Sequence, residues 1–179
     1  MIYVFLAEGF EEIEALTPVD ILRRGGVEVV TVGIGSQTIK GSHSITVTAD
    51  ITDNDITTYD SVEGVILPGG MPGTLHLEQN QTVIDMVDYC ARHHLLIGAI
   101  CAAPSILGHM GLLRGKTATA FPSFEPELEG ATLGDYTVRD DMIVTARGMG
   151  VSVEFALMLL SVLKGEEQAE KIRKSIQCR

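Results

Sequence analysis

The chain has 179 residues and a formal net charge of -11; 45% of the residues are hydrophobic and 21% are charged. This composition is typical of a globular protein with one domain, which we expect to span residues 1–179. The acidic charge argues against nucleic acid or an anionic membrane as partner, because both need a basic surface, but it permits a small carbonyl substrate.

Segments with strand and helix patterns alternate along the whole chain. Strands are expected at residues 2–7, 27–34, 62–68, 95–100 and 116–121. Helices are expected at residues 10–26, 74–93, 102–112 and 150–164, followed by an amphipathic tail. Residues 37–58 suggest a small hairpin or a peripheral strand, and residues 136–147 suggest a hairpin that turns at Asp140 and Asp141. The alternation predicts one α/β domain, in which helices cover both faces of a mostly parallel sheet.

The hydropathy pattern and the cysteines favour a reducing cytoplasm. No apolar run reaches the ~20 residues of a membrane-spanning helix. The first apolar run has no basic segment before it, so it does not resemble a signal peptide. The cysteines, Cys90, Cys101 and Cys178, are odd in number and form no C-x-x-C pair. We therefore expect no disulfide framework, no metal site and no cofactor.

Functional groups in such a sheet gather at the carboxyl ends of the strands. Four segments follow strands in this way: residues 8–14, 68–74, 101–103 and 120–122. We expect these segments to lie close together and to form the site.

Cys101 stands at a strand-to-helix turn between small residues, Ala99 and Ala103, with Pro104 in the first turn of the following helix. Such a turn projects its side chain above the sheet, as in a nucleophile elbow. The thiol would then face a helix N-terminus, which favours the thiolate and lowers the pKa. The alternative is an unreactive, buried cysteine that ends a core strand. The small flanking residues favour a reactive cysteine at an elbow. Cys90 and Cys178 lack this setting, and we interpret both as structural.

A glycine pair, Gly69 and Gly70, follows the third strand in the motif "LPGG". The N–H of Gly70, together with that of Ala102, could form an oxyanion hole over Cys101. A plain strand-ending turn is the alternative, and only the position at the same sheet end as Cys101 favours the oxyanion hole.

Four glutamates surround the start of the first helix in "EGFEEIEAL". Glu11 and Glu12 are expected to be solvated. Glu14 shares a helical face with apolar residues and should point inward, where a buried carboxyl tends to stay protonated. It could relay a proton or donate a hydrogen bond to a thiolate or sulfinate of Cys101. A carboxyl that caps local backbone is an equally good interpretation.

No histidine is placed to serve as the base of a cysteine hydrolase. The chain has five: His43, His76, His93, His94 and His109. Only His76, just after the glycine pair, could approach Cys101. Phe121 occupies the end of the fifth strand, where a base could have stood. A cysteine peptidase or amidase is therefore the weakest of the functional hypotheses.

Four motifs in the same order, "EGFEEIEALTPVDILRRGG", "VILPGG", "AICAAP" and "ARGMGVSVEFAL", resemble the ThiJ/PfpI superfamily over nearly the whole chain. They look closest to the branch of the human parkinsonism-associated protein deglycase. The resemblance implies a flavodoxin-like three-layer α/β sandwich of the class I glutamine amidotransferase type, and a homodimer. It also implies that Cys101 is the reactive cysteine, that Glu14 lies beside it, and that Gly70 and Ala102 supply backbone donors.

The resemblance also places Arg147 near the dimer-facing side of the site. Some family members have histidine at the position of Phe121, so the phenylalanine puts triad-based peptidase activity in doubt. We expect the site to be lined by Gly69, Met71, Phe121, Pro122 and Arg147.

Family activities include glyoxalase-like conversion of 2-oxoaldehydes, deglycation, chaperone action and redox sensing. The first hypothesis is a stress-protective enzyme that acts on 2-oxoaldehydes or their glycation adducts, with Cys101 as nucleophile and Glu14 as proton relay. The second is an oxidative-stress sensor or chaperone in which Cys101 oxidises to sulfinate. Because both use the same residues, the sequence does not choose between them.

Overall fold

A seven-stranded sheet forms the middle layer of the structure, a computed structural model that describes residues 1–178. Its strand order is β10-β11-β7-β6-β1-β2-β5. The strands are β1 (Ile2–Leu6), β2 (Val29–Gly33), β5 (Ile51–Thr52), β6 (Gly64–Leu67), β7 (Leu96–Ile100), β10 (Thr137–Asp140) and β11 (Ile143–Ala146). All neighbours run parallel except β10 and β11, which form an antiparallel hairpin with its turn at Asp141.

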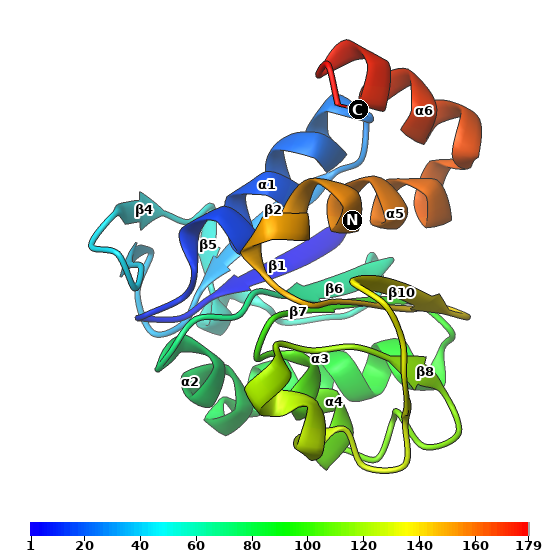
Figure 1. Cartoon of the computed structure of the whole chain (residues 1–179). Coiled ribbons are helices and arrows are strands. Elements are labelled where there is room, and N and C mark those ends of the chain that lie inside the picture. The colour runs from blue at the N-terminus through cyan, green and yellow to red at the C-terminus, as the bar shows by residue number, and fades with distance from the viewer. Residues whose placement is uncertain (179) are drawn as a thin grey trace.

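Helices cover both faces of the sheet (Figure 1). On one face lie α1 (Glu12–Arg24), α5 (Ser152–Lys164) and α6 (Glu166–Ser175), and on the other lie α2 (Gly73–Gln79), α3 (Gln81–Arg92) and α4 (Pro104–His109). Because both faces are covered, β1, β6 and β7 are buried along their whole length and consist of nearly continuous apolar runs. The predicted three-layer, mostly parallel α/β sandwich is confirmed.

Each face of the sheet has its own hydrophobic core. On the α1–α5 side, Phe10, Leu22 and Phe155 pack against the sheet. On the other side, Phe5 and Met86 belong to the core beneath α2, α3 and α4. The two cores hold the strand ends rigidly, so loops at the carboxyl edge of the sheet start from fixed positions.

The expected helix at residues 74–93 is two helices that meet at Asn80. Asn80 has an extended backbone and its side-chain oxygen accepts a hydrogen bond from the N–H of Val83 at 3.1 Å. This N-cap starts α3 in a new direction, because asparagine stabilises a helix start better than a helix interior.

The expected fifth strand, residues 116–121, does not join the central sheet. Only Thr117–Ala118 (β8) is a strand, and it pairs with Thr132–Leu133 (β9) in a separate two-stranded sheet. The place beside β7 is taken by β11, whose four residues are all buried, whereas Thr117 is exposed. The more apolar segment therefore occupies the interior position.

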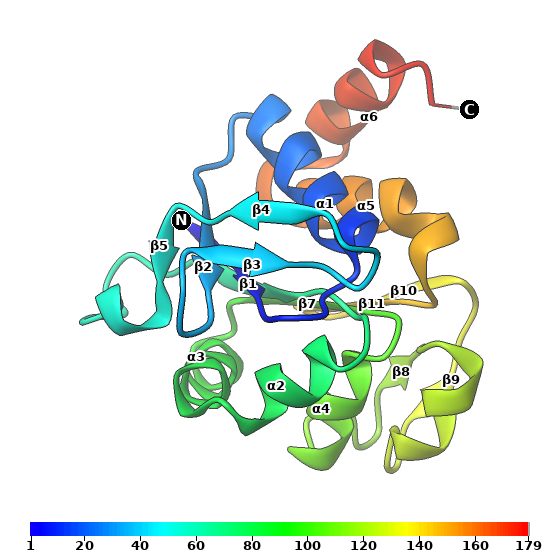
Figure 2. The ribbon, with the colours of Figure 1, turned by 90° about the vertical axis from the view of Figure 1, so that its left-hand side faces the viewer.

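The segment 37–58 contains a hairpin of β3 (Thr38–Lys40) and β4 (Thr46–Thr48), which lies beside the N-terminal half of α1 in Figure 2. It continues into β5 at the sheet edge. Short 3-10 helices are η1 (Asp53–Asp55), η2 (Pro122–Glu127) and η3 (Met149–Val151). Among residues 1–178, no helix is both long and apolar enough to cross a membrane.

Candidate active site

Cys101 directly follows β7, at the carboxyl edge of the sheet, and its φ angle is +64°. A residue with a side chain rarely adopts this left-handed conformation, which is strained and typical of a nucleophile elbow. Two backbone hydrogen bonds of 2.8 Å hold it: its N–H donates to Ala146 in β11, and its carbonyl accepts from Phe121. Three segments of the chain thus fix the position of the thiol.

Glu14 lies in the first turn of α1 and is 1% exposed. Its Oε2 atom accepts a hydrogen bond from the N–H of Gly69 at 3.0 Å, and the N–H of Met149 also donates to the carboxyl. The carboxyl interacts with the Cys101 thiol. Glu14 therefore points inward, as its helical face predicts. It does not cap its own helix; Glu11 does so, accepting from the Glu14 N–H at 2.7 Å.

The thiol and the carboxyl shift each other's proton affinity. Burial raises the pKa of Glu14 to about 7. Burial also raises the pKa of Cys101 to about 12, and the negative charge of Glu14 adds to this effect, while the amides of Ala102 and Gly70 oppose it. The expected lowering of the thiol pKa is therefore wrong. The helix behind the thiol, α4, has only six residues, and burial beside a carboxyl outweighs it.

The same pair gives a route to the thiolate. When the carboxyl holds the proton, its charge no longer opposes ionisation of the sulfur and its O–H can donate to it. The thiol and the carboxyl therefore titrate as a coupled pair. A proton that moves from sulfur to carboxyl leaves the thiolate facing two backbone donors.

Those donors are the backbone N–H groups of Gly70 and Ala102, both directed at the sulfur. Gly70 has a φ angle of +93°, and a side chain there would collide with the backbone N–H of Glu11. Its carbonyl accepts from both the N–H (2.9 Å) and the hydroxyl (3.0 Å) of Thr74, which fixes the loop. Gly69 packs directly against Cys101. Neither position has room for a side chain, because the backbone of Glu11 lies against Gly70 and Cys101 lies against Gly69.

A pocket of about 670 Å³ opens beside the thiol. Its walls come from the start of η2, from the residue before β10 and from the loop between β11 and α5: Phe121, Pro122, Tyr136, Arg147, Gly148, Met149, Gly150 and Val151. Phe121, Pro122 and Arg147, which the sequence analysis names as lining residues, lie in this wall. Met71 is exposed in the Gly70 loop and is not part of this wall.

Sequence reasoning missed Tyr136, Gly148 and Met149. Met149 reaches the site through its backbone N–H, which no side-chain pattern reveals. The available signal was the motif "ARGMG" directly after a buried strand, since a loop in that position belongs to the carboxyl edge of the sheet.

None of the five histidines hydrogen-bonds to Cys101 in the part of the chain that the structure describes. His76, the nearest in sequence to the glycine pair, bonds through Nδ1 to the carbonyl of Glu8 at 2.9 Å. His109 lies between the carboxyls of Glu78 and Glu127. The site is therefore a thiol–carboxyl pair without an imidazole base.

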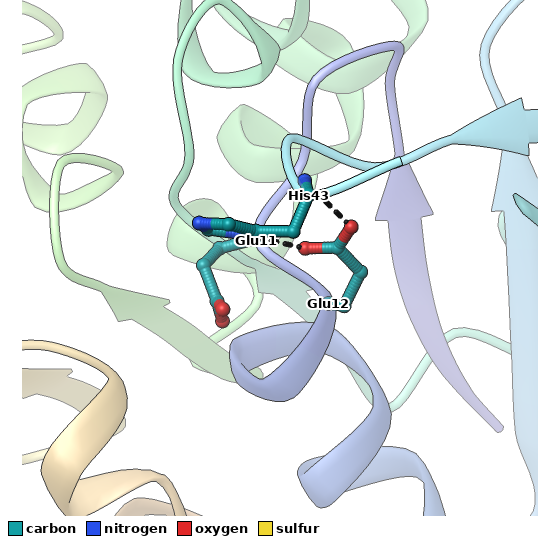
Figure 3. A group of neighbouring side chains, drawn as sticks. All are labelled: Glu11, Glu12 and His43. Carbon is teal, nitrogen blue, oxygen red and sulfur yellow. Dashed lines mark hydrogen bonds and ion pairs between the residues drawn. The ribbon is translucent and has the colours of Figure 1, made fainter. Parts of the chain in front are cut away.

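Glu12 is buried and not solvated, contrary to the expectation. Figure 3 shows its carboxyl facing His43, from which it accepts hydrogen bonds through the backbone N–H (2.8 Å) and Nδ1 (3.1 Å). It also accepts from the N–H of Ile45 at 3.3 Å. Glu11, Glu12 and His43 lie close enough together that they could hold a metal ion. However, the carboxylates already accept protein donors at the positive end of α1, so the group ties the β3–β4 hairpin to the helix.

The chain is similar to known proteins over nearly its whole length. A family model described as "DJ-1/PfpI family" matches residues 1–162. Protein dj-1beta of Drosophila melanogaster is 34% identical over 177 residues, covering 97% of this chain and 94% of that protein. A Caenorhabditis elegans protein named glutathione-independent glyoxalase DJR-1.2 is 30% identical over 173 residues, covering 94% and 91%. The solved structure titled "Toxoplasma gondii DJ-1, oxidized" has a TM-score of 0.94 and 33% identity, covering 99% of this chain and 97% of that one.

Proposed function

The chain belongs to the DJ-1/PfpI family, and on that basis we propose that it is a cofactor-free cysteine enzyme that converts reactive 2-oxoaldehydes to 2-hydroxy acids, or acts on their glycation adducts. One observation carries the proposal: a buried carboxyl with a raised pKa faces a thiol that two backbone amides already approach. The relative named as a glutathione-independent glyoxalase supports the same class of reaction.

The Cys101 thiol, with a pKa of about 12, gives its proton to the Glu14 carboxylate, with a pKa of about 7, only as the sulfur begins to bond to the substrate. The sulfur attacks the aldehyde carbon, and the N–H groups of Gly70 and Ala102 stabilise the negative oxygen that develops. Glu14 returns the proton that it took from the thiol to this oxygen, which completes a hemithioacetal and restores the carboxylate. Each group needed for this step lies within the cluster described above.

Glu14 next moves a proton between neighbouring carbons. As a carboxylate it removes the hydrogen from the former aldehyde carbon, and as a carboxylic acid it returns a proton to the adjacent carbon. The hydroxyl proton passes from the oxygen of the first carbon to the oxygen of the second. The product is a 2-hydroxy thioester, which water hydrolyses to the 2-hydroxy acid and free Cys101. One carbon is oxidised and its neighbour reduced, so no external oxidant or reductant is required. A pKa of about 7 suits a group that must act as both base and acid near neutral pH.

A redox-sensor or chaperone role is the second candidate, and the solved oxidized relative favours it. In this function Cys101 oxidises to a sulfinate, whose oxygens the same two amides and a protonated Glu14 would stabilise. A peptidase role has no imidazole base to support it.

We also propose that the protein is a homodimer of the reducing cytoplasm. A groove between α1, the β3–β4 loop, α5 and the chain end exposes the apolar side chains of Ile13, Ile45 and Val153. Such a patch on a surface helix is typical of a subunit interface. Its test is the molar mass in solution, with Ile13→Asp expected to give monomers. Cys90 and Cys101 form no disulfide, which is consistent with a reducing compartment.

The enzyme hypothesis is tested by lactate formation from methylglyoxal, with Cys101→Ser and Glu14→Gln as variants. Lactate formation that both substitutions abolish is expected. If the wild type forms lactate no faster than Cys101→Ser, the enzyme hypothesis is wrong. Peroxide treatment followed by mass spectrometry then tests the sensor: a stable gain of two oxygens on Cys101, before Cys90 and Cys178 react, is its expected result.

A further inference from the structure

Gly148 leaves a hollow between the thiol and the pocket beside it. Its φ angle of 161° is extended backbone that any residue can adopt. A β-carbon at this position would lie 3.6 Å from Cδ2 of Phe121, 3.9 Å from Oε1 of Glu14 and 4.0 Å from Sγ of Cys101. A group bonded to the sulfur and extending over Gly148 can therefore contact both the carboxyl and the phenyl ring.

The pocket beyond Gly148 has mainly apolar walls that are exposed to solvent. The side chains of Phe121 and Met149 are 47% and 50% exposed, and Tyr136, Pro122 and Val151 complete the apolar surface. Exposed apolar side chains gathered around a concave surface are typical of a ligand-binding site. A substituent that covers Phe121 and Met149 would remove this surface from water.

Among residues 1–178, Arg147 is the only charged residue that lines the pocket, and it already forms an ion pair; its Nε atom is buried and has no hydrogen-bond partner there. Its guanidinium donates to Oε1 of Glu125 at 3.0 Å and lies 5.3 Å from the centre of the Tyr136 ring. An anionic substituent would have to compete with Glu125 for Arg147, whereas an uncharged one would not. The pocket therefore favours neutral, apolar substituents over carboxylates and phosphates.

We propose that this pocket selects 2-oxoaldehydes that carry an uncharged aromatic or bulky apolar substituent, with Phe121 as the wall that determines this specificity. The inference rests on the proposed function, because it names the substrate class of the same site. The dicarbonyl unit lies at Cys101, Glu14 and the two backbone amides, and the substituent extends over Gly148 onto the ring of Phe121.

The first test compares kcat/KM for phenylglyoxal and methylglyoxal. We expect the wild type to favour phenylglyoxal by about 10-fold, which corresponds to about 1.4 kcal/mol, in the range of one aromatic contact. Phe121→Ala should lower this ratio several-fold, mainly through KM for phenylglyoxal. Leu133→Ala removes an equally exposed apolar side chain from β9, outside the pocket, and should leave the ratio unchanged.

A second test separates the pocket from the enzymatic hypothesis. Alkylation of Cys101 by phenacyl bromide and by bromoacetone is followed by mass spectrometry, and each rate is divided by that of free cysteine with the same reagent. The normalised preference for the phenyl reagent should fall in Phe121→Ala and persist in Leu133→Ala. Absence of turnover with both aldehydes would refute the proposed function alone, because alkylation still reports on the pocket. A normalised ratio near one in the wild type, or one that Phe121→Ala leaves unchanged, would overturn the inference.

Discussion

Replacement of Glu14 by glutamine should make the protein relatively more stable as the pH rises. The folded protein buries the Glu14 carboxyl almost completely, at 1% exposure, and burial raises its pKa from the ordinary 4.5 to about 7. Stability that depends on the neutral carboxyl is fully present below pH 4.5 and is lost as the pH rises through about 7. Glutamine is similar in shape, stays neutral, and can accept the same hydrogen bond from Gly69.

The size of the effect follows from the two pKa values. The difference between 4.5 and about 7 is about 2.5 pH units. At 1.36 kcal/mol per unit, ionisation in the folded state costs about 3 kcal/mol. The thiol of Cys101 stays protonated below pH 8 in both the folded and the unfolded chain, so it adds little to this difference. Relative to wild type, the free energy of unfolding of Glu14→Gln should therefore rise by about 3 kcal/mol between pH 4 and pH 8.

Urea denaturation at several pH values measures this difference. The chain has no tryptophan, so far-ultraviolet circular dichroism is the suitable signal. Glu167→Gln, on α6, is exposed and serves as the control for the removal of one negative charge. If the stability curves of Glu14→Gln and wild type run parallel from pH 4 to pH 8, the assignment of Glu14 as a buried carboxyl with a raised pKa is refuted.

Three further substitutions test other parts of the structure. Hydrogen bonds that the His109 ring donates to the carboxylates of Glu127 and Glu78 raise its pKa. The stability that they contribute is therefore present below pH 6.5 and is lost at higher pH. The difference in melting temperature between wild type and His109→Gln should shrink from pH 6 to pH 9, and a constant difference would contradict this pairing. Glu12→Ala removes the carboxylate that accepts hydrogen bonds from the β3–β4 loop and should lower the free energy of unfolding by about 1–3 kcal/mol. Amide exchange in residues 41–45 should become faster, and unchanged exchange there would show that Glu12 does not hold the loop. Asn80→Ala removes the N-cap of α3 and should cost about 1 kcal/mol in urea denaturation, whereas an unchanged midpoint would argue against the cap.

Much of the fold could be predicted because its main signals are local. Apolar runs such as residues 2–7 and 95–100 are long enough to identify buried strands, and their alternation with helices indicates a parallel sheet. The errors arise where segments compete. Asn80 could continue a helix or start a new one. Residues 116–121 were expected to form a strand of the central sheet, but the more deeply buried β11 pairs with β7 instead.

The residues at the centre of the site could be predicted equally well, but the pKa of the thiol could not. The small residues around Cys101 and the inward face of Glu14 are local patterns, and the structure brings both residues together with Gly70 and Ala102. The direction of the thiol pKa could not be predicted, because it depends on burial and on a carboxyl from another helix. The pocket wall at Met149 depends in the same way on how the chain folds back after β11.

The hydrogen bonds around Cys101 also determine when the site can form during synthesis. The N–H of Cys101 needs the carbonyl of Ala146, and the carboxyl of Glu14 needs the N–H of Met149. A nascent chain that ends before these residues leave the ribosome contains the cysteine but not its elbow or its completed carboxyl partner. Its thiol then lacks the contacts that fix its position, and the Cys101–Glu14 pair is complete only after residue 149 has left the ribosome.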